Sequence, residues 1–186
     1  MGPRQPAPPA VGWRPPLPAA LLAAVLLAGA PGEAAAQRSA ALTVGGGLAP
    51  YDLSGVGTSW VAGGELSTPV GGLMLAEAGS RIFRYEPEAG RHVTHLFPSA
   101  GLYLDAGGRD FRVYTGGGVG LSLVPEGRGD TELTLHAAGG FRIRIRPRWL
   151  VRPEIRVRSV DPWTGTTGEF TVGMTYRFGA RERGGS

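Results

Sequence analysis

Apolar and polar residues alternate along most of the chain after residue 40, in segments of roughly ten residues. The last segment is the clearest, with apolar Phe170, Val172, Met174, Tyr176 and Phe178 set between Thr171, Gly173, Thr175 and Arg177. Successive side chains of a β-strand point to opposite faces. The segment therefore predicts a strand with one apolar face and one small or polar face.

Eight such segments follow one another, separated by Gly, Pro and Asp. We expect strands at 40–48, 59–67, 73–85, 93–105, 111–123, 131–146, 149–160 and 169–178. The connections 69–72, 107–110 and 146–148 are short, whereas 49–58, 86–92, 124–130 and 161–168 are longer. An even number of strands, with short turns on one side and longer loops on the other, is typical of bacterial transmembrane β-barrels.

The alternation assigns a lipid-facing set of residues near the end of the chain: Phe141, Ile143, Ile155, Val157, Phe170, Val172 and Met174. The third expected strand is less regular, because Leu73 and Leu75 share a face with Glu77 and Arg81. Pro98 and Pro153 each remove a backbone donor from the ladder, so we expect a β-bulge at both.

Alternation alone also fits a soluble barrel with the opposite polarity. Three features favour lipid outside: a leader segment with a terminal aromatic strand, small residues on the non-apolar face, and aromatic residues at strand ends. The aromatic residues are Trp60, Phe111, Trp149, Phe170, Tyr176 and Phe178. A soluble periplasmic, lipocalin-like ligand carrier remains the alternative.

The first 36 residues have the features of a secretory signal peptide. Arg4 and Arg14 precede an apolar run at 19–30, and an A-x-A site ends at Ala36. The run is too short for a membrane-spanning helix, which needs about 20 apolar residues. We therefore expect a signal peptide at 1–36, a barrel at 37–178 and a polar tail at 179–186.

Composition narrows the possible chemistry. The chain of 186 residues has no cysteine, so disulfides and thiolate metal sites are excluded. Its 19 basic residues are all arginine, and the net charge of +4 raises the question of a nucleic-acid partner. Arg142, Arg144 and Arg146 alternate with apolar residues, so they belong to a sheet face, and we expect no nucleic acid.

The arginine face of an eight-stranded barrel encloses a narrow lumen that side chains can fill. Charges placed there must pair, because an unpaired buried charge costs several kcal/mol. We predict a lumen salt-bridge network of Glu65, Glu77, Asp105, Arg112, Arg142, Arg144, Arg152 and Glu154. Arg146, Arg148 and Arg177 are expected at the wet rim. An anion-selective pore is the alternative to such a plug.

Candidate catalytic residues are few: His92, His95, Ser99 and His136. Nucleophilic catalysis needs a serine and a histidine within hydrogen-bond reach. His95 and Ser99 would be about 13 Å apart along one strand. His92 and His95 have metal-pair spacing, but no further ligands are evident. We expect no catalytic residue, no metal and no cofactor.

The terminal strand resembles the C-terminal signal strand of bacterial outer-membrane barrels, which typically ends in Phe. Residues 38–178 resemble the small OmpA/OmpX-like outer-membrane β-barrel family in strand number, loop asymmetry and terminal strand. The short outer loops and the tail after Phe178 depart from that pattern. The resemblance implies an all-β, eight-stranded, antiparallel, up-and-down transmembrane β-barrel, made with a signal peptide, in a Gram-negative outer membrane.

The resemblance also implies partners and a role. The partners are the lipid bilayer of the outer membrane and the barrel-insertion machinery, which would recognise Tyr176 and Phe178. The role is non-catalytic, structural or in surface interaction, with the extracellular ligand open. A lipid-modifying outer-membrane enzyme is the alternative.

Overall fold

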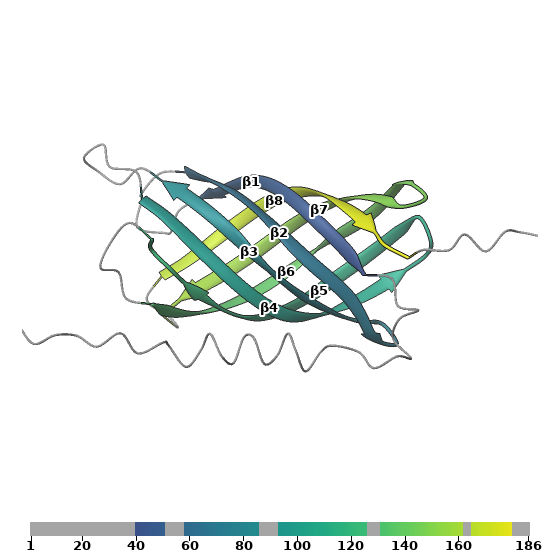
Figure 1. The fold of residues 1–186 in the computed structure, drawn as a ribbon, viewed down its shortest axis with the longest axis horizontal. Coiled ribbons are helices and arrows are strands. Elements are labelled where there is room, and N and C mark those ends of the chain that lie inside the picture. The colour runs from purple at the N-terminus through teal and green to yellow at the C-terminus, as the bar shows by residue number, and fades with distance from the viewer. Residues whose placement is uncertain (1–39, 51–57, 86–92, 126–130, 162–164, 180–186) are drawn as a thin grey trace, which may run out of the picture. The chain divides into compact units, whose positions relative to one another are not determined.

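The computed structural model describes residues 40–50, 58–85, 93–125, 131–161 and 165–179. Eight antiparallel strands form one closed barrel, in which each strand pairs with its sequence neighbours and the last pairs with the first (Figure 1). The strands are β1 (Ala41–Pro50), β2 (Thr58–Gly71), β3 (Met74–Tyr85), β4 (Val93–Gly107), β5 (Phe111–Ser122), β6 (Glu132–Arg146), β7 (Trp149–Val160) and β8 (Gly165–Arg177). The predicted up-and-down barrel is confirmed.

The two ends of the barrel differ. The turn end is the end at which β1 begins, β8 finishes, and residues 72–73, 108–110 and 147–148 connect neighbouring strands. The loop end carries the longer connections. In Figure 1 the arrowhead of β8 points to the turn end, at the right. The β2–β3 turn at the turn end uses Gly72 at a φ of 51°, in the left-handed region that favours glycine.

The predicted signal peptide at 1–36 and the tail beyond Gly179 lie outside the described residues. The part of the chain that the structure describes contains no helix long and apolar enough to cross a membrane.

Most of the large apolar side chains of the strands point outward. On β7, Ile155 is 62% exposed and its neighbour Arg156 is 1% exposed. All seven residues assigned to the lipid face are exposed: Phe141, Ile143, Ile155, Val157, Phe170, Val172 and Met174. A water-soluble barrel would have the opposite polarity, because burial of apolar surface drives its folding. Alternation on β6, β7 and β8 therefore places the apolar side chains on the outer wall.

The prediction of a β-bulge at Pro98 and at Pro153 is wrong. Pro98 pairs with Ser80 and Pro153 pairs with Val172 in unbroken registers on one side. On the other side, the ladder skips the residues opposite each proline and resumes in the same register. Each strand thus accommodates its proline, which has no backbone N–H donor, through a local gap in the pairing with one neighbouring strand. The irregularities lie at Pro69/Gly71 and Arg144/Arg146 instead.

The lumen is filled in layers. An apolar cluster of Ala49, Val61, Phe83 and Phe97 closes it towards the loop end. A second cluster, of Leu75, Tyr103, Tyr114 and Ala138, lies nearer the turn end. The irregular pattern of the third expected strand follows from this filling, because Leu75 and Phe83 are buried on the same face as Glu77 and Arg81.

Candidate functional site

The buried charged side chains of the lumen form the candidate site. Five carboxylates and five guanidinium groups are buried in the described part of the chain, so their formal charges cancel. They come from β2, β3, β4, β6, β7 and β8. The carboxylates are those of Glu65, Glu77, Asp105, Glu154 and Glu169, and the guanidinium groups are those of Arg81, Arg142, Arg152, Arg156 and Arg158.

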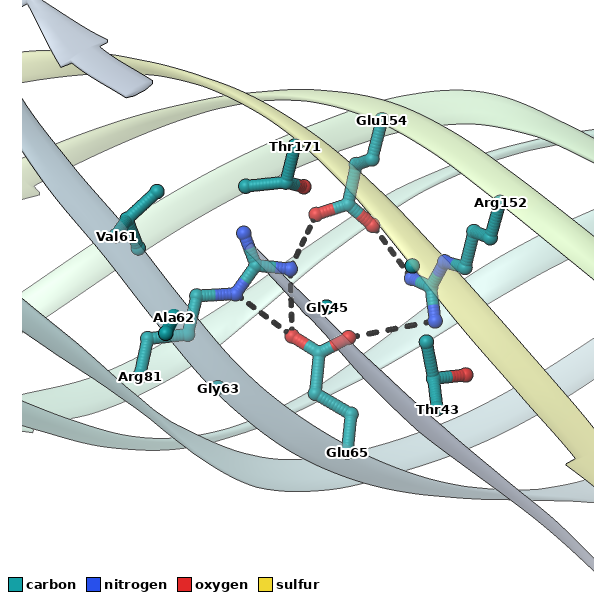
Figure 2. A pocket seen from close by; sticks show the side chains of 11 residues that line it. Thr43, Gly45, Val61, Ala62, Gly63, Glu65, Arg81, Arg152, Glu154 and Thr171 are labelled. Carbon is teal, nitrogen blue, oxygen red and sulfur yellow. Dashed lines mark hydrogen bonds and ion pairs between the residues drawn. The ribbon is translucent and has the colours of Figure 1, made fainter. Parts of the chain in front are cut away.

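Four of these side chains form a closed ring of alternating charge, shown in Figure 2. Arg81 Nη2 lies 2.7 Å from Glu65 Oε1 and 2.5 Å from Glu154 Oε1. Arg152 closes the ring, with Nη2 at 2.5 Å from Glu154 Oε2 and Nη1 at 3.3 Å from Glu65 Oε2. The ring joins β7 to β2 and β3 across the lumen, so it connects β7 with two strands that do not pair with it.

Further hydrogen bonds connect the ring to Glu77, Arg156 and Tyr114. Arg152 donates from both terminal nitrogens to Glu77, at 2.6 and 3.0 Å. Arg156 donates to Glu65 at 2.8 Å and to Glu154 at 3.0 Å. The Tyr114 hydroxyl donates to Glu154 at 2.7 Å and accepts from Arg152 Nε at 2.7 Å. Charge-assisted, bidentate bonds of this kind are strong and fix geometry.

The network continues towards both ends of the barrel. Towards the loop end, Glu169 accepts from Arg81 at 2.8 Å and from Arg158 at 2.9 Å. The Arg158 guanidinium carbon also lies 4.6 Å from the centre of the Phe97 ring, a cation–π contact. Towards the turn end, Asp105 accepts from Arg112 and Arg142, each at 3.1 Å.

This arrangement leaves little space in the middle of the lumen. The cavity among Glu65, Arg81, Arg152, Glu154 and Thr43 has a volume of about 20 Å³. That is enough for about one water molecule. The middle of the lumen is therefore occupied by side chains.

Three of the carboxylates lie close enough together to raise the question of a metal. Glu65, Glu77 and Glu154 place one oxygen each within 4.8 Å of one another. The same carboxylates accept hydrogen bonds from Arg81, Arg152 or Arg156. A divalent cation at their centre would face these guanidinium groups, so the donor set fits arginine pairing better than metal binding.

Among the described candidates, His95, His136 and Ser99 do not form a catalytic group with one another. His136 Nε2 lies 3.0 Å from the Tyr103 hydroxyl, and His95 Nδ1 lies 3.3 Å from Ser122 Oγ. Ser122 is 1% exposed and points into the lumen. A lipid in the surrounding membrane therefore has no access to this serine. His92 lies outside the described residues.

The structure brings together seven of the eight residues assigned to the salt-bridge network: Glu65, Glu77, Asp105, Arg112, Arg142, Arg152 and Glu154. Arg144 lies outside it. Its nearest carboxylate is the exposed Asp110, at 3.7 Å. Arg144 is one lumen-facing position beyond Arg142 on β6, about 6.6 Å nearer the turn end.

Four members of the network were not predicted from the sequence: Arg81, Arg156, Arg158 and Glu169. A signal for two of them was present, because Arg156 and Arg158 continue the alternation that contains Arg152 and Glu154. Arg81 was obscured by the apolar residues on its own face of β3. Glu169 is the first residue of the last expected strand, whereas the observed strand begins four residues earlier, at Gly165, and Glu169 lies inside it.

No family model matches this chain, and no curated protein matches it in sequence. Several solved structures with the same fold are small outer-membrane barrels. Neisserial surface protein A superposes with a TM-score of 0.59 at 13% identity, over 76% of this chain and 97% of that one. The N-terminal barrel domain of Pseudomonas aeruginosa OprF gives 0.58 at 13% identity, over 76% and 98%. The attachment invasion locus protein of Yersinia pestis, Ail, gives 0.56 at 12% identity, over 76% and 99%.

At identities this low, the structural similarity shows a common fold and nothing more specific. The chain has the architecture of the small eight-stranded outer-membrane barrels, as its resemblance to the OmpA/OmpX-like family led us to expect. Its exposed apolar wall is suited to contact with lipid tails. Fold and wall together support the predicted location, an outer membrane, with the barrel embedded in the lipid bilayer.

Proposed function

We propose that this protein is a non-catalytic outer-membrane barrel whose lumen is plugged by arginine–carboxylate ion pairs. Its role is structural or in surface interaction. The observation that carries the proposal is the set of five buried carboxylates and five buried guanidinium groups that pair with one another along the lumen. Removing one partner from a buried pair costs about 3–5 kcal/mol, so the network resists opening.

Single-channel recording tests the plug directly. The purified protein, inserted into a planar bilayer, is expected to show no large steady conductance in salt solution. An ion crossing the lumen would have to displace Arg81 or Arg152 from carboxylates at 2.5–3.3 Å. A large steady current, with anion selectivity, would instead establish the open-pore alternative.

The alternative of a lipid-modifying enzyme needs a test of its own, because Ser122 and His95 place a serine hydroxyl 3.3 Å from an imidazole nitrogen. We expect mass spectrometry of lipid A to give the same acyl pattern from cells with and without the gene. A pattern that changes with the gene, and reverts in a Ser122→Ala variant, would establish catalysis at this pair.

The soluble carrier has little support. A carrier of apolar ligands needs an open apolar interior, whereas the middle of this lumen holds ion pairs and a cavity of only about 20 Å³. Fractionation without detergent is the simple check. We expect the protein to remain with the membrane pellet.

A further inference from the structure

The charge balance of the lumen does not extend to its turn end. A cavity of about 160 Å³ opens there, and its lining includes Asp105, Arg112, Arg142, Leu150, Thr175 and Arg177. Three guanidinium groups thus face one carboxylate, which leaves a formal charge of +2. The cavity in the middle of the lumen is about 20 Å³ and is lined by balanced charges.

The arginines at this cavity have unused donors. Asp105 accepts single bonds from Arg112 Nε and Arg142 Nη1 through its carboxylate. Arg142 is 7% exposed, yet its Nε is buried without an acceptor among the described residues. Arg177 is half-buried in the cavity wall and forms no ion pair with any residue that the structure describes. Buried donors of this kind normally have a partner.

The size of the cavity indicates how large that partner is. Engineered cavities of about 150 Å³ hold a molecule the size of benzene. A volume of 160 Å³ therefore admits a small tetrahedral oxyanion together with one or two waters. Guanidinium groups suit such a ligand, because their planar donor pairs match phosphate oxygens.

We propose that the turn end of the lumen binds a phosphate group, held by Arg112, Arg142 and Arg177. A phosphate dianion neutralises the +2 charge of the lining. The ligand is either free phosphate in the solution outside this end of the barrel or the headgroup of an adjacent phospholipid. Arg142 and Asp105 also belong to the lumen network, whereas Arg112 and Arg177 form no ion pair with the four residues of the central ring.

Calorimetric titration of the full protein in maltoside micelles with inorganic phosphate tests the proposal. We expect saturable binding to one site. Arg177→Gln and Arg112→Gln should each weaken it by about tenfold or more, since each removes a charge-assisted hydrogen bond. Arg146→Gln is the matched control, because Arg146 is exposed at the same end, carries the same charge, and does not line the cavity.

Heat-modifiable gel migration shows whether each variant is folded. With folded variants, absence of saturable binding overturns the proposal. An equal loss in Arg146→Gln also overturns it, because binding would then depend only on general positive charge.

A second titration, in phosphatidylglycerol nanodiscs, identifies the source of the ligand. Phosphate binding that persists there points to the free ion. Loss of binding in nanodiscs, together with binding in micelles, points to the lipid headgroup.

Discussion

At the scale of single residues, Glu154 is the most connected carboxylate of the lumen. It accepts hydrogen bonds from Arg81, Arg152, Arg156 and Tyr114. Each of these three arginines also contacts a second carboxylate. The arginines are therefore held in position by shared acceptors, and loss of one acceptor affects them all.

We predict that Glu154→Gln destabilises the folded barrel by about 3–5 kcal/mol, because it leaves an uncompensated positive charge in the buried network. Urea unfolding in lipid vesicles, followed by tryptophan fluorescence, measures the change. Asp110→Asn is the control: the Asp110 side chain is 79% exposed and its 3.7 Å contact to Arg144 is worth less than about 1 kcal/mol. Equal effects of the two substitutions would show that the network adds no stability.

At the scale of the strand, glycines on the lumen face allow the strands to approach closely. A Cβ on Gly118 of β5 would lie 2.0 Å from the carbonyl oxygen of Ala100 and 2.5 Å from Gly101 Cα. Both atoms belong to the backbone of β4, which cannot move without separating the two strands. The lumen-facing glycines therefore provide space for the large ion-paired side chains and for the closure of the barrel.

Gly118→Ala is thus expected to destabilise the barrel by about 1–3 kcal/mol, the usual cost of overpacking. It should also reduce the yield of heat-modifiable protein on refolding. Gly139→Ala, on neighbouring β6, is the matched control, since its Cβ would lie at an ordinary 3.5 Å from the Tyr114 carbonyl oxygen. Full refolding of Gly118→Ala, at the level of Gly139→Ala, would contradict the close approach.

Strand positions and faces could be predicted where alternation is strict, as in β6, β7 and β8. Prediction was weaker where the lumen itself contains apolar residues. Leu75 and Phe83 fill the lumen beside Glu77 and Arg81, so β3 has no simple polar face. A two-residue period cannot distinguish a buried apolar layer from a change of phase.

The full set of contacts among the charges was beyond prediction for a different reason. Arg152 on β7 reaches Glu77 on β3, and Arg81 on β3 reaches Glu169 on β8. These contacts cross the lumen between strands that are not neighbours, so they depend on the barrel's closure and on the reach of long side chains. Local sequence shows only that charges share the enclosed face.

At the scale of the whole molecule, the seam between β1 and β8 decides whether the sheet closes. The Phe178 amide donates to the Ala40 carbonyl at 2.8 Å, immediately after the last residue of β8. The Phe178 ring lies 5.0 Å from that of Tyr176, which in turn lies 5.0 Å from Trp149. These aromatic residues form part of the outer wall at the turn end, where interfacial aromatic belts of membrane barrels lie.

We predict that Phe178 acts in assembly more than in stability. Phe178→Ser keeps the backbone bond to Ala40, so the purified variant should refold into lipid vesicles about as well as the parent. In cells, the heat-modifiable form in the outer-membrane fraction should fall severalfold, because the insertion machinery would lose its terminal aromatic residue. Phe170→Ser is the matched control, since Phe170 is on the outer face of the same strand and similarly exposed, at 55% against 44%. If both variants reach the outer membrane in equal amounts, the terminal residue is part of the lipid-facing wall and not a recognition signal.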